Sequence, residues 1–108
     1  MTEAAFMGQI IDTARLLGWR CYHTADSRRS QAGYPDLTLV RDRIVFLEVK
    51  TETGRISTEQ ADWIAAINAA GGTALVVRPS QWDEIVASLK RRVPRTLGEA
   101  IQSGEVAA

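Results

Sequence analysis

The sequence predicts a single α/β domain whose helices and strands follow in the order α-β-β-β-α-β-α. Two observations predict this fold class. Apolar residues recur at helical spacing near the start of the chain, after position 57 and after position 80, and two strongly apolar runs that share a short polar turn lie between the first two of these segments. The 108 residues, of which 45% are hydrophobic, suffice to bury one core. No linker or repeat divides the chain.

The charge balance is neutral, with 13 Lys+Arg against 13 Asp+Glu. A protein that binds nucleic acid usually has an excess of basic residues. A protein that binds phosphate through a metal also needs carboxylates, so a neutral charge balance does not exclude a nucleic-acid partner. The composition excludes a disordered or collagen-like chain, and the single Cys21 excludes a disulfide framework. Because we find no membrane span and no signal peptide, we expect a soluble intracellular domain.

The first helix is predicted over Thr2–Leu17, where apolar residues recur at three-to-four spacing until Gly18 ends the pattern. The short aromatic segment Trp19–His23 predicts a strand. Residues 24–35 are polar and contain glycine and proline, which predicts a loop.

Two apolar runs, Asp36–Val40 and Ile44–Lys50, flank the polar turn 41–43 and predict a β-hairpin. A three-residue loop pairs position 40 with 44, 38 with 46 and 36 with 48. This register gathers five apolar side chains on one face, whereas a two-residue loop would scatter them over both faces. The five are Leu37, Leu39, Val45, Leu47 and Val49. The same register sets Asp36 opposite Glu48, with Lys50 on the same face.

The remaining elements follow from capping and breaking signals. Ser57 to Gln60 fits a capping box that opens a helix to about Ala70, and Gly71-Gly72 ends it. Residues 73–77 predict a strand, and Pro79-Ser80 opens a helix that Pro94 ends. Residues 96–99 are able to cap one further short helix. The inward side chains of these helices are expected to be Trp63, Ile64, Ile67, Trp82, Ile85, Val86 and Leu89.

The facing carboxylates of Asp36 and Glu48 carry the chemistry of the predicted hairpin. Two carboxylates a few ångströms apart repel each other unless a cation or a proton lies between them. Mg²⁺ and Mn²⁺ prefer oxygen ligands, and the backbone carbonyl of Val49 offers a further oxygen. Lys50 would then lie near a metal-bound water or a phosphate oxygen, where it would help lower the pKa of that water and stabilise charge in the transition state. The alternative is that Asp36 only begins a strand after Pro35, with Glu48 and Lys50 facing solvent; the opposite placement of the carboxylates favours the site.

Three motifs together resemble the PD-(D/E)xK nuclease signature. They are Gly33-Tyr34-Pro35-Asp36-Leu37, then Glu48-Val49-Lys50, then Gln60 in the following helix. More narrowly, they resemble the VRR-NUC family, the virus-type replication-repair nuclease domain, in its stand-alone phage or bacterial form. The resemblance covers roughly residues 1–78 and implies a restriction-endonuclease-like αβββαβ core, a mixed sheet flanked by helices. The segment of about 80–103 would add a C-terminal helix within the same domain, and the protein would act in the cytoplasm of a bacterium or of a phage's host.

Carried over residue by residue, the resemblance implies that Asp36 and Glu48 are metal ligands and that Lys50 is the catalytic lysine. Gln60 would be the helix glutamine that orients the lysine or the substrate. Its alternative role in the capping box does not exclude this one. Glu3 would be the first-helix acid that completes or supports the metal shell. Alternatively, Glu3 only places a favourable negative charge in the first helical turn.

The other polar candidates have weaker signals. Arg28 and Arg29, in the loop before the motif, are candidates for DNA-phosphate contacts or for an ordinary solvated loop. Lys90–Arg95 would line a DNA path or complement a helix C-terminus. We interpret His23 as structural rather than as a general base. The cysteine and the three tryptophans are expected in the core, at Cys21, Trp19, Trp63 and Trp82.

The resulting hypothesis is a divalent-metal-dependent DNA-repair endonuclease. Stand-alone members of the family resemble homodimeric resolvases of Holliday (four-way) junctions, so branched DNA is the implied substrate. One alternative is a nuclease of the same type for flap, splayed-arm or duplex DNA. A non-catalytic DNA-structure-binding module is the alternative of another class. No organic cofactor and no membrane partner are expected.

Overall fold

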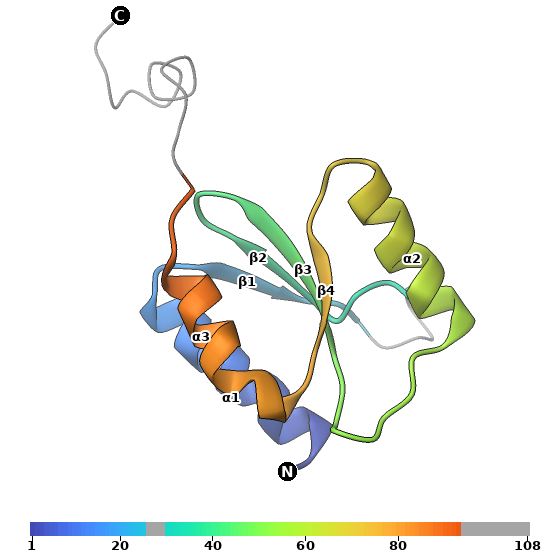
Figure 1. The fold of residues 1–108 in the computed structure, drawn as a ribbon, viewed down its shortest axis with the longest axis horizontal. Coiled ribbons are helices and arrows are strands. Elements are labelled where there is room, and N and C mark those ends of the chain that lie inside the picture. The colour runs from blue at the N-terminus through green and yellow to red at the C-terminus, as the bar shows by residue number, and fades with distance from the viewer. Residues whose placement is uncertain (26–29, 94–108) are drawn as a thin grey trace, which may run out of the picture.

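The computed structural model describes residues 1–25 and 30–93, which form four strands flanked by helices (Figure 1). The elements are α1 (Glu3–Leu16), β1 (Arg20–His23), β2 (Leu37–Val40), β3 (Ile44–Val49), α2 (Thr58–Ala69), β4 (Ala74–Val77), the 3₁₀ turn η1 (Pro79–Gln81) and α3 (Trp82–Lys90). Both the α/β class and the element order are confirmed. No helix in this part of the chain is long and apolar enough to cross a bilayer.

The sheet is mixed and has the strand order β1-β2-β3-β4. The pairs β1–β2 and β2–β3 are antiparallel, whereas β4 runs parallel to β3 after the crossover through α2. Figure 1 shows α1 and α3 together on one face of the sheet and α2 on the other. Because β1 and β4 stand first and last in the strand order, they are the two edge strands of this sheet.

The predicted hairpin register is confirmed, with Val40 paired to Ile44 and Leu37 paired to Leu47. All five side chains that the register gathers on one face are buried, none of them more than 6% exposed. They pack against α1 and α3 in one apolar core. Besides these five residues, the core contains Phe6, Ile10, Ala14, Trp19, Val77, Ile85 and Leu89.

Both ends of α1 follow the capping rules that its sequence suggests. The hydroxyl of Thr2 accepts a hydrogen bond from the Ala5 N–H at 3.1 Å. At the other end Gly18 has a φ of +90°, and the Trp19 N–H donates to the Ala14 carbonyl at 2.9 Å. This pattern is a Schellman motif, which favours glycine because of the left-handed backbone.

The helix α3 ends at Lys90, so the prediction that it runs until Pro94 is wrong. Two arginines of the β2–β3 turn bind carbonyls near its C-terminus: Arg43 donates to Ser88 O at 2.8 Å, and both Arg41 and Arg43 donate to Arg91 O at 2.9 Å. Arg91 has an extended backbone. Arg43 thus binds the Ser88 carbonyl that Arg92 would use in a longer helix, and the Val93 N–H donates to Asp42 Oδ2 at 2.8 Å instead of to a helix carbonyl. These contacts with the turn end the helix early. Pro94 and the predicted cap at residues 96–99 lie outside the described residues.

The face of α2 toward the sheet is less buried than the sequence suggests. Trp63, Ile64 and Ile67 are only half-buried, and none of the 12 residues of α2 is fully buried. Its main anchor is aromatic, because Tyr34 makes edge-to-face contacts with Trp63 at 5.0 Å and with Phe46 at 6.3 Å between ring centroids.

The other core predictions hold in part. Trp19 is buried, and its indole N–H donates to the Leu89 carbonyl at 2.9 Å. Trp82 is half-buried and meets Phe6 edge to face. Cys21 is partly rather than fully buried, because it lies in the edge strand β1, and it packs against the margin of the core.

Candidate active site

Asp36 is held at the start of β2 by contacts on both sides. The preceding Pro35 is buried, and its carbonyl accepts a hydrogen bond from the Thr24 hydroxyl at 2.6 Å. The Asp36 carboxylate atom Oδ2 accepts the Val49 N–H at 2.9 Å, which fastens it to the end of β3. Asp36 therefore lies across from the Glu48–Lys50 segment, as the hairpin register predicts.

Glu48 is the one charged residue buried among those described, with 1% of its surface exposed. Its Oε1 accepts a hydrogen bond from Gln60 Nε2 at 3.0 Å, while its Oε2 has no hydrogen-bond partner within the described residues. Burial, followed by the negative charge of Asp36, raises the pKa of Glu48 to about 8, although Lys50 opposes the shift. The carboxylate pair is thus short of positive charge.

Lys50 supplies the positive charge nearest to this pair in the described chain. Its Nζ lies 3.9 Å from Glu48 Oε1, and its side chain is largely buried, with 13% exposed. The Lys50 N–H donates to the Val77 carbonyl at 3.0 Å, so the parallel β3–β4 ladder fixes its backbone. The lysine therefore has a defined place beside the carboxylates.

Gln60 joins the helix cap to the acidic site. Its Oε1 accepts the Ser57 N–H at 2.9 Å, which completes the capping box, and its Nε2 donates to Glu48. The capping box is therefore confirmed, and the same side chain also contacts Glu48; its role in orienting Lys50 or the substrate stays a prediction. Because the cap occupies the carbonyl end of the amide, the NH₂ end must face Glu48.

Gly33 brings the loop before Asp36 against the first turn of α2. Its φ is +87°, and a Cβ added there would lie 2.5 Å from the Glu59 carbonyl carbon. Only glycine permits this approach of two backbones. The contact places α2, and with it Gln60, at a fixed position relative to Asp36. The motif points to Gly33, but not to Glu59 as its contact.

Arg78 is a further supporting residue that the sequence did not reveal. Its Nη1 donates to the carbonyls of Thr51 at 2.5 Å and Gly54 at 2.8 Å, so it holds the loop that follows Lys50. No local pattern in the sequence links Arg78 to that loop, which lies some two dozen positions earlier.

A cavity of about 310 Å³ opens beside Asp36. Glu3 at the start of α1, His23 at the end of β1, and Gln60 line its wall. The charge of Glu3 also contributes to the raised pKa of Glu48. Among residues 1–25 and 30–93, however, no three His, Cys, Asp or Glu side chains are grouped closely enough to hold a metal together. Glu3 is thus near the site without joining the two carboxylates in one cluster.

The donor set fits a hard divalent cation. The buried Oε2 of Glu48 lacks a partner, and the adjacent Asp36 adds a second carboxylate. A buried unpaired carboxylate is costly unless a proton or a cation neutralises it. Oxygen ligands from two carboxylates, with water in the remaining positions, are typical of Mg²⁺ sites. The Val49 peptide lies at the same place, as its hydrogen bond to Asp36 shows.

The structure describes only some of the basic residues that were predicted to contact DNA. Arg28 and Arg29 lie outside the described residues, as do the last two positions of Lys90–Arg95. Lys90, Arg91 and Arg92 are exposed, and the carbonyls near the end of α3 are bound by Arg41 and Arg43 instead.

This combination of a mixed sheet, two carboxylates at strand ends and a lysine two residues beyond the second is the arrangement of the PD-(D/E)xK nucleases. The chain belongs to the VRR-NUC family, because the VRR-NUC domain matches residues 7–81, more than half of its length. It is accordingly a nuclease of the PD-(D/E)xK type, a hydrolase that acts on DNA. Neither a curated protein nor a solved structure matches the chain.

Proposed function

We propose that the protein is a divalent-metal-dependent, structure-selective endonuclease that cleaves Holliday (four-way) junctions as a homodimer. One observation carries the metal-dependent part: Asp36 and Glu48 share a buried site in which one carboxylate oxygen has no partner among the described residues. A cation would remove the cost of that buried charge and bring a phosphate to the same place. Mg²⁺ is the proposed ion, and Mn²⁺ would substitute for it.

When bound, the divalent ion supplies a water of lowered pKa for in-line attack on phosphorus and offsets the charge that develops there. Asp36 and Glu48 each contribute a carboxylate to hold it, and we assign the Val49 carbonyl as a further ligand. Glu3, on the wall of the adjacent cavity, is proposed to support this shell from α1. The hydrogen bond from the Val49 N–H keeps the Asp36 carboxylate oriented.

Lys50 is proposed to contact a non-bridging phosphate oxygen and to stabilise its growing negative charge. Its Nζ already lies 3.9 Å from Glu48, so a phosphate held by the same carboxylate pair would come within its reach. Gln60 keeps Glu48 in place through the 3.0 Å hydrogen bond, while the capping box keeps Gln60 in place. In this proposal Lys50 stabilises the phosphate charge and Gln60 positions Glu48, and no histidine is needed as a general base.

The preference for branched DNA and the dimer rest on the family resemblance and on symmetry. A four-way junction has two-fold symmetry, and a two-fold dimer would present one site to each of two strands. In this proposal Arg28 and Arg29 contact the DNA backbone next to the cleaved bond, and the protein acts in the cytoplasm.

The test is cleavage of a labelled four-way junction beside splayed-arm, flap and duplex controls, in Mg²⁺, Mn²⁺ and EDTA. We expect paired nicks near the branch point, present with either ion and absent in EDTA. Cleavage of the controls in preference to the junction would retain the nuclease and reject the resolvase. Cleavage of every DNA in EDTA would reject the metal-dependent mechanism.

A further inference from the structure

The cavity beside Asp36 has room for more than a metal ion. It has a volume of about 310 Å³ and is bounded by α1, the end of β1, the loop that precedes Asp36, and α2. This volume lies in the range of small-molecule pockets, about 300–1,000 Å³, whereas a water molecule takes only about 30 Å³. A divalent ion with its waters would therefore leave part of the cavity open to another group of the substrate.

The charges that line this cavity indicate which group of a DNA strand fits there. The carboxylates of Glu3 and Asp36 line it, whereas no Lys or Arg does so among the residues that the structure describes. A second phosphate, placed in the part of the cavity beyond the metal, would face these carboxylates, and like charges at short distance repel each other. The cavity therefore suits an uncharged part of the strand.

Apolar side chains line part of the same cavity. Met7 of α1 is half-buried, and Ala25, which follows β1, is exposed. Tyr34 also contributes to the wall, and edge-to-face contacts with Trp63 and Phe46 fix its ring. Such a wall favours a base, because the flat faces of a base gain contacts and leave water when they are buried.

Two polar side chains of the cavity are free to recognise the edge of a base. The hydroxyls of Thr24 and Ser30 already donate to backbone carbonyls, at 2.6 and 2.9 Å. The side chains of His23 and Gln31, by contrast, are exposed and make no hydrogen bond within residues 1–25 and 30–93. The amide of Gln31 offers a donor beside an acceptor, a pattern that is complementary to the edge of a base.

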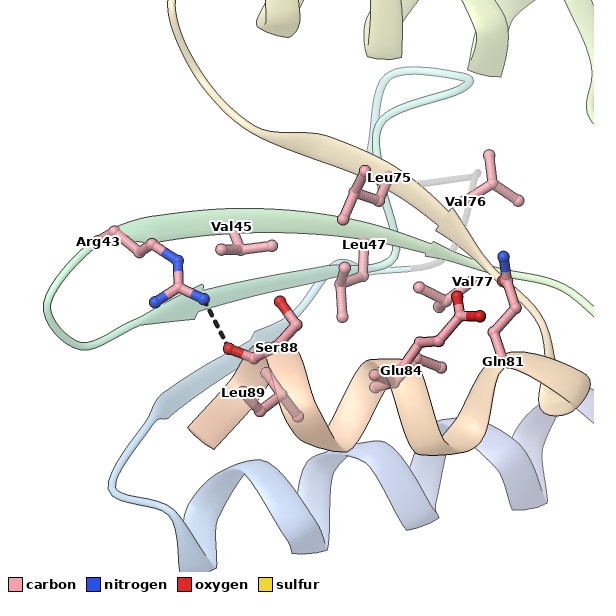
Figure 2. Close-up of a pocket in the computed structure, with 11 residues that line it drawn as sticks. Arg43, Val45, Leu47, Leu75, Val76, Val77, Gln81, Glu84, Ser88 and Leu89 are labelled. Carbon is pink, nitrogen blue, oxygen red and sulfur yellow. Dashed lines mark hydrogen bonds between the residues drawn. The ribbon is translucent and has the colours of Figure 1, made fainter. Parts of the chain in front are cut away.

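A groove between β4 and α3 has a similar size but lacks these features (Figure 2). Its volume is about 260 Å³, and it lies against the apolar core, because Leu47 and Val77 belong to both. Arg43, at one end of the groove, is already hydrogen-bonded to the Ser88 carbonyl at 2.8 Å. Neither carboxylate of the candidate active site lines this groove. The first cavity is therefore distinguished by its position beside Asp36 and by its free polar groups, and not by its size.

We propose that the cavity beside Asp36 binds one unpaired base of the DNA strand, from a nucleotide next to the cleaved bond. This inference rests on the proposed function and deepens it, because it names the part of the substrate that the cavity recognises. Asp36 belongs both to the carboxylate pair and to the cavity wall, so a phosphate held at the pair brings a neighbouring base within reach of the cavity. Met7 and Ala25 contact the faces of this base, and Gln31 contacts its edge.

Entry of a base into the cavity requires that the base has left the helical stack. In a continuous duplex this costs the pairing and stacking energy of one nucleotide, whereas a base in a single strand or at a branch point pays less. The cavity thus gives the chain a physical reason to prefer branched or single-stranded DNA over continuous duplex, without any contact to paired bases.

The test is a double-mutant cycle between the cavity and the base. One probe is a fluorescent oligothymidylate, and the other is an oligonucleotide of equal length whose sugars carry no base, so that both offer the same phosphates. Ala25→Leu narrows the cavity, Gln31→Ala removes the free amide, and Ala32→Leu, at an exposed loop position outside the cavity wall, is the matched control. Every protein of the binding series also carries Lys50→Ala, so that the DNA stays intact in Mg²⁺.

Ala25→Leu and Gln31→Ala are each expected to weaken binding of the oligothymidylate by roughly 5- to 100-fold, the range for loss of the contacts of one base. Both should leave binding of the abasic probe unchanged, and Ala32→Leu should change neither. Equal weakening of both probes, or no weakening of either, overturns the base site. Because the abasic probe reports the phosphate contacts and the fold of the same sample, a misfolded variant cannot imitate the expected result.

Cleavage by the chain that retains Lys50 separates this inference from the proposed function. Selective weakening of oligothymidylate binding, in a protein that cleaves no DNA, would reject the proposed function alone. Metal-dependent cleavage of the four-way junction, by a protein in which Ala25→Leu and Gln31→Ala alter the binding of neither probe, would reject the base site alone.

Discussion

The two faces of the sheet differ in what covers them and in what they bury. Toward α1 and α3, the strands bury a continuous apolar cluster that holds the helices. Toward α2, no helix residue is fully buried, and the strand residue buried most deeply is the charged Glu48. The first face therefore supplies most of the stability, and the second buries a carboxylate whose charge is costly unless a proton or a bound cation neutralises it. Substitutions on the two faces should accordingly separate folding from activity.

Neighbouring residues of β3 give the largest expected contrast, because Leu47 and Glu48 point to opposite faces. Leu47→Ala should lower the free energy of unfolding by about 2–5 kcal/mol, since it leaves a cavity in the core. Glu48→Gln should keep the fold but lose metal-dependent DNA cleavage. Denaturant unfolding and a cleavage assay on both variants check this. A Glu48→Gln protein as unstable as Leu47→Ala, or one that still cleaves, would contradict the division between the faces.

Lys50→Ala should reduce the cleavage rate by roughly 10²–10³-fold, the range expected for loss of one group that stabilises transition-state charge. Binding of DNA and the melting temperature should change little, because the lysine backbone contact to Val77 remains. Single-turnover kinetics beside a binding assay would separate these effects. Exposed Arg55, in the loop after Lys50, offers the matched control Arg55→Ala. Undiminished cleavage by Lys50→Ala would remove the lysine from the mechanism.

Gly33→Ala should lower cleavage by about 10–100-fold, the range for residues that orient metal ligands, because the new Cβ pushes Glu59 and hence Gln60 away from Glu48. Two glycines serve as controls. Gly71→Ala shares the positive φ, at +93°, but meets nothing within 4 Å, and Gly8→Ala has neither feature. If Gly71→Ala loses as much activity as Gly33→Ala, general instability explains the loss and the contact with α2 does not.

A further contrast between the faces is a pH dependence of stability without metal. The pKa of Glu48 rises from an ordinary 4.5 to about 8, so the folded state binds this proton more tightly than the unfolded state. Its contribution is complete below pH 4.5 and is lost as the pH rises through 8. In EDTA, the melting temperature of the unmodified protein should therefore fall across this window relative to that of Glu48→Gln. A difference that stays constant, or changes in the opposite direction, would contradict the raised pKa.

How much of this structure the sequence predicts depends on how far apart in the sequence the interacting residues lie. The hairpin register follows from side-chain alternation and loop length, so the pairing of Val40 with Ile44 and the position of Asp36 across from the Glu48–Lys50 segment could be predicted. The cap of α2 is equally local. The early end of α3 could not be predicted, because Arg43 binds Ser88 from 45 positions away. The contact of Gly33 with Glu59 and the hydrogen bond from Arg78 to the Thr51 carbonyl likewise join residues that are far apart in the sequence.

Calorimetric titration of Mn²⁺ into the full chain tests the central claim most directly, namely that the buried carboxylates bind a divalent cation. The account predicts saturable binding that both Asp36→Asn and Glu48→Gln abolish. Glu59→Gln, at an exposed acid in the first turn of α2, should bind like the unmodified protein. Absence of binding to the unmodified protein, or equal binding by all four proteins, would contradict the metal site on which the proposed chemistry depends.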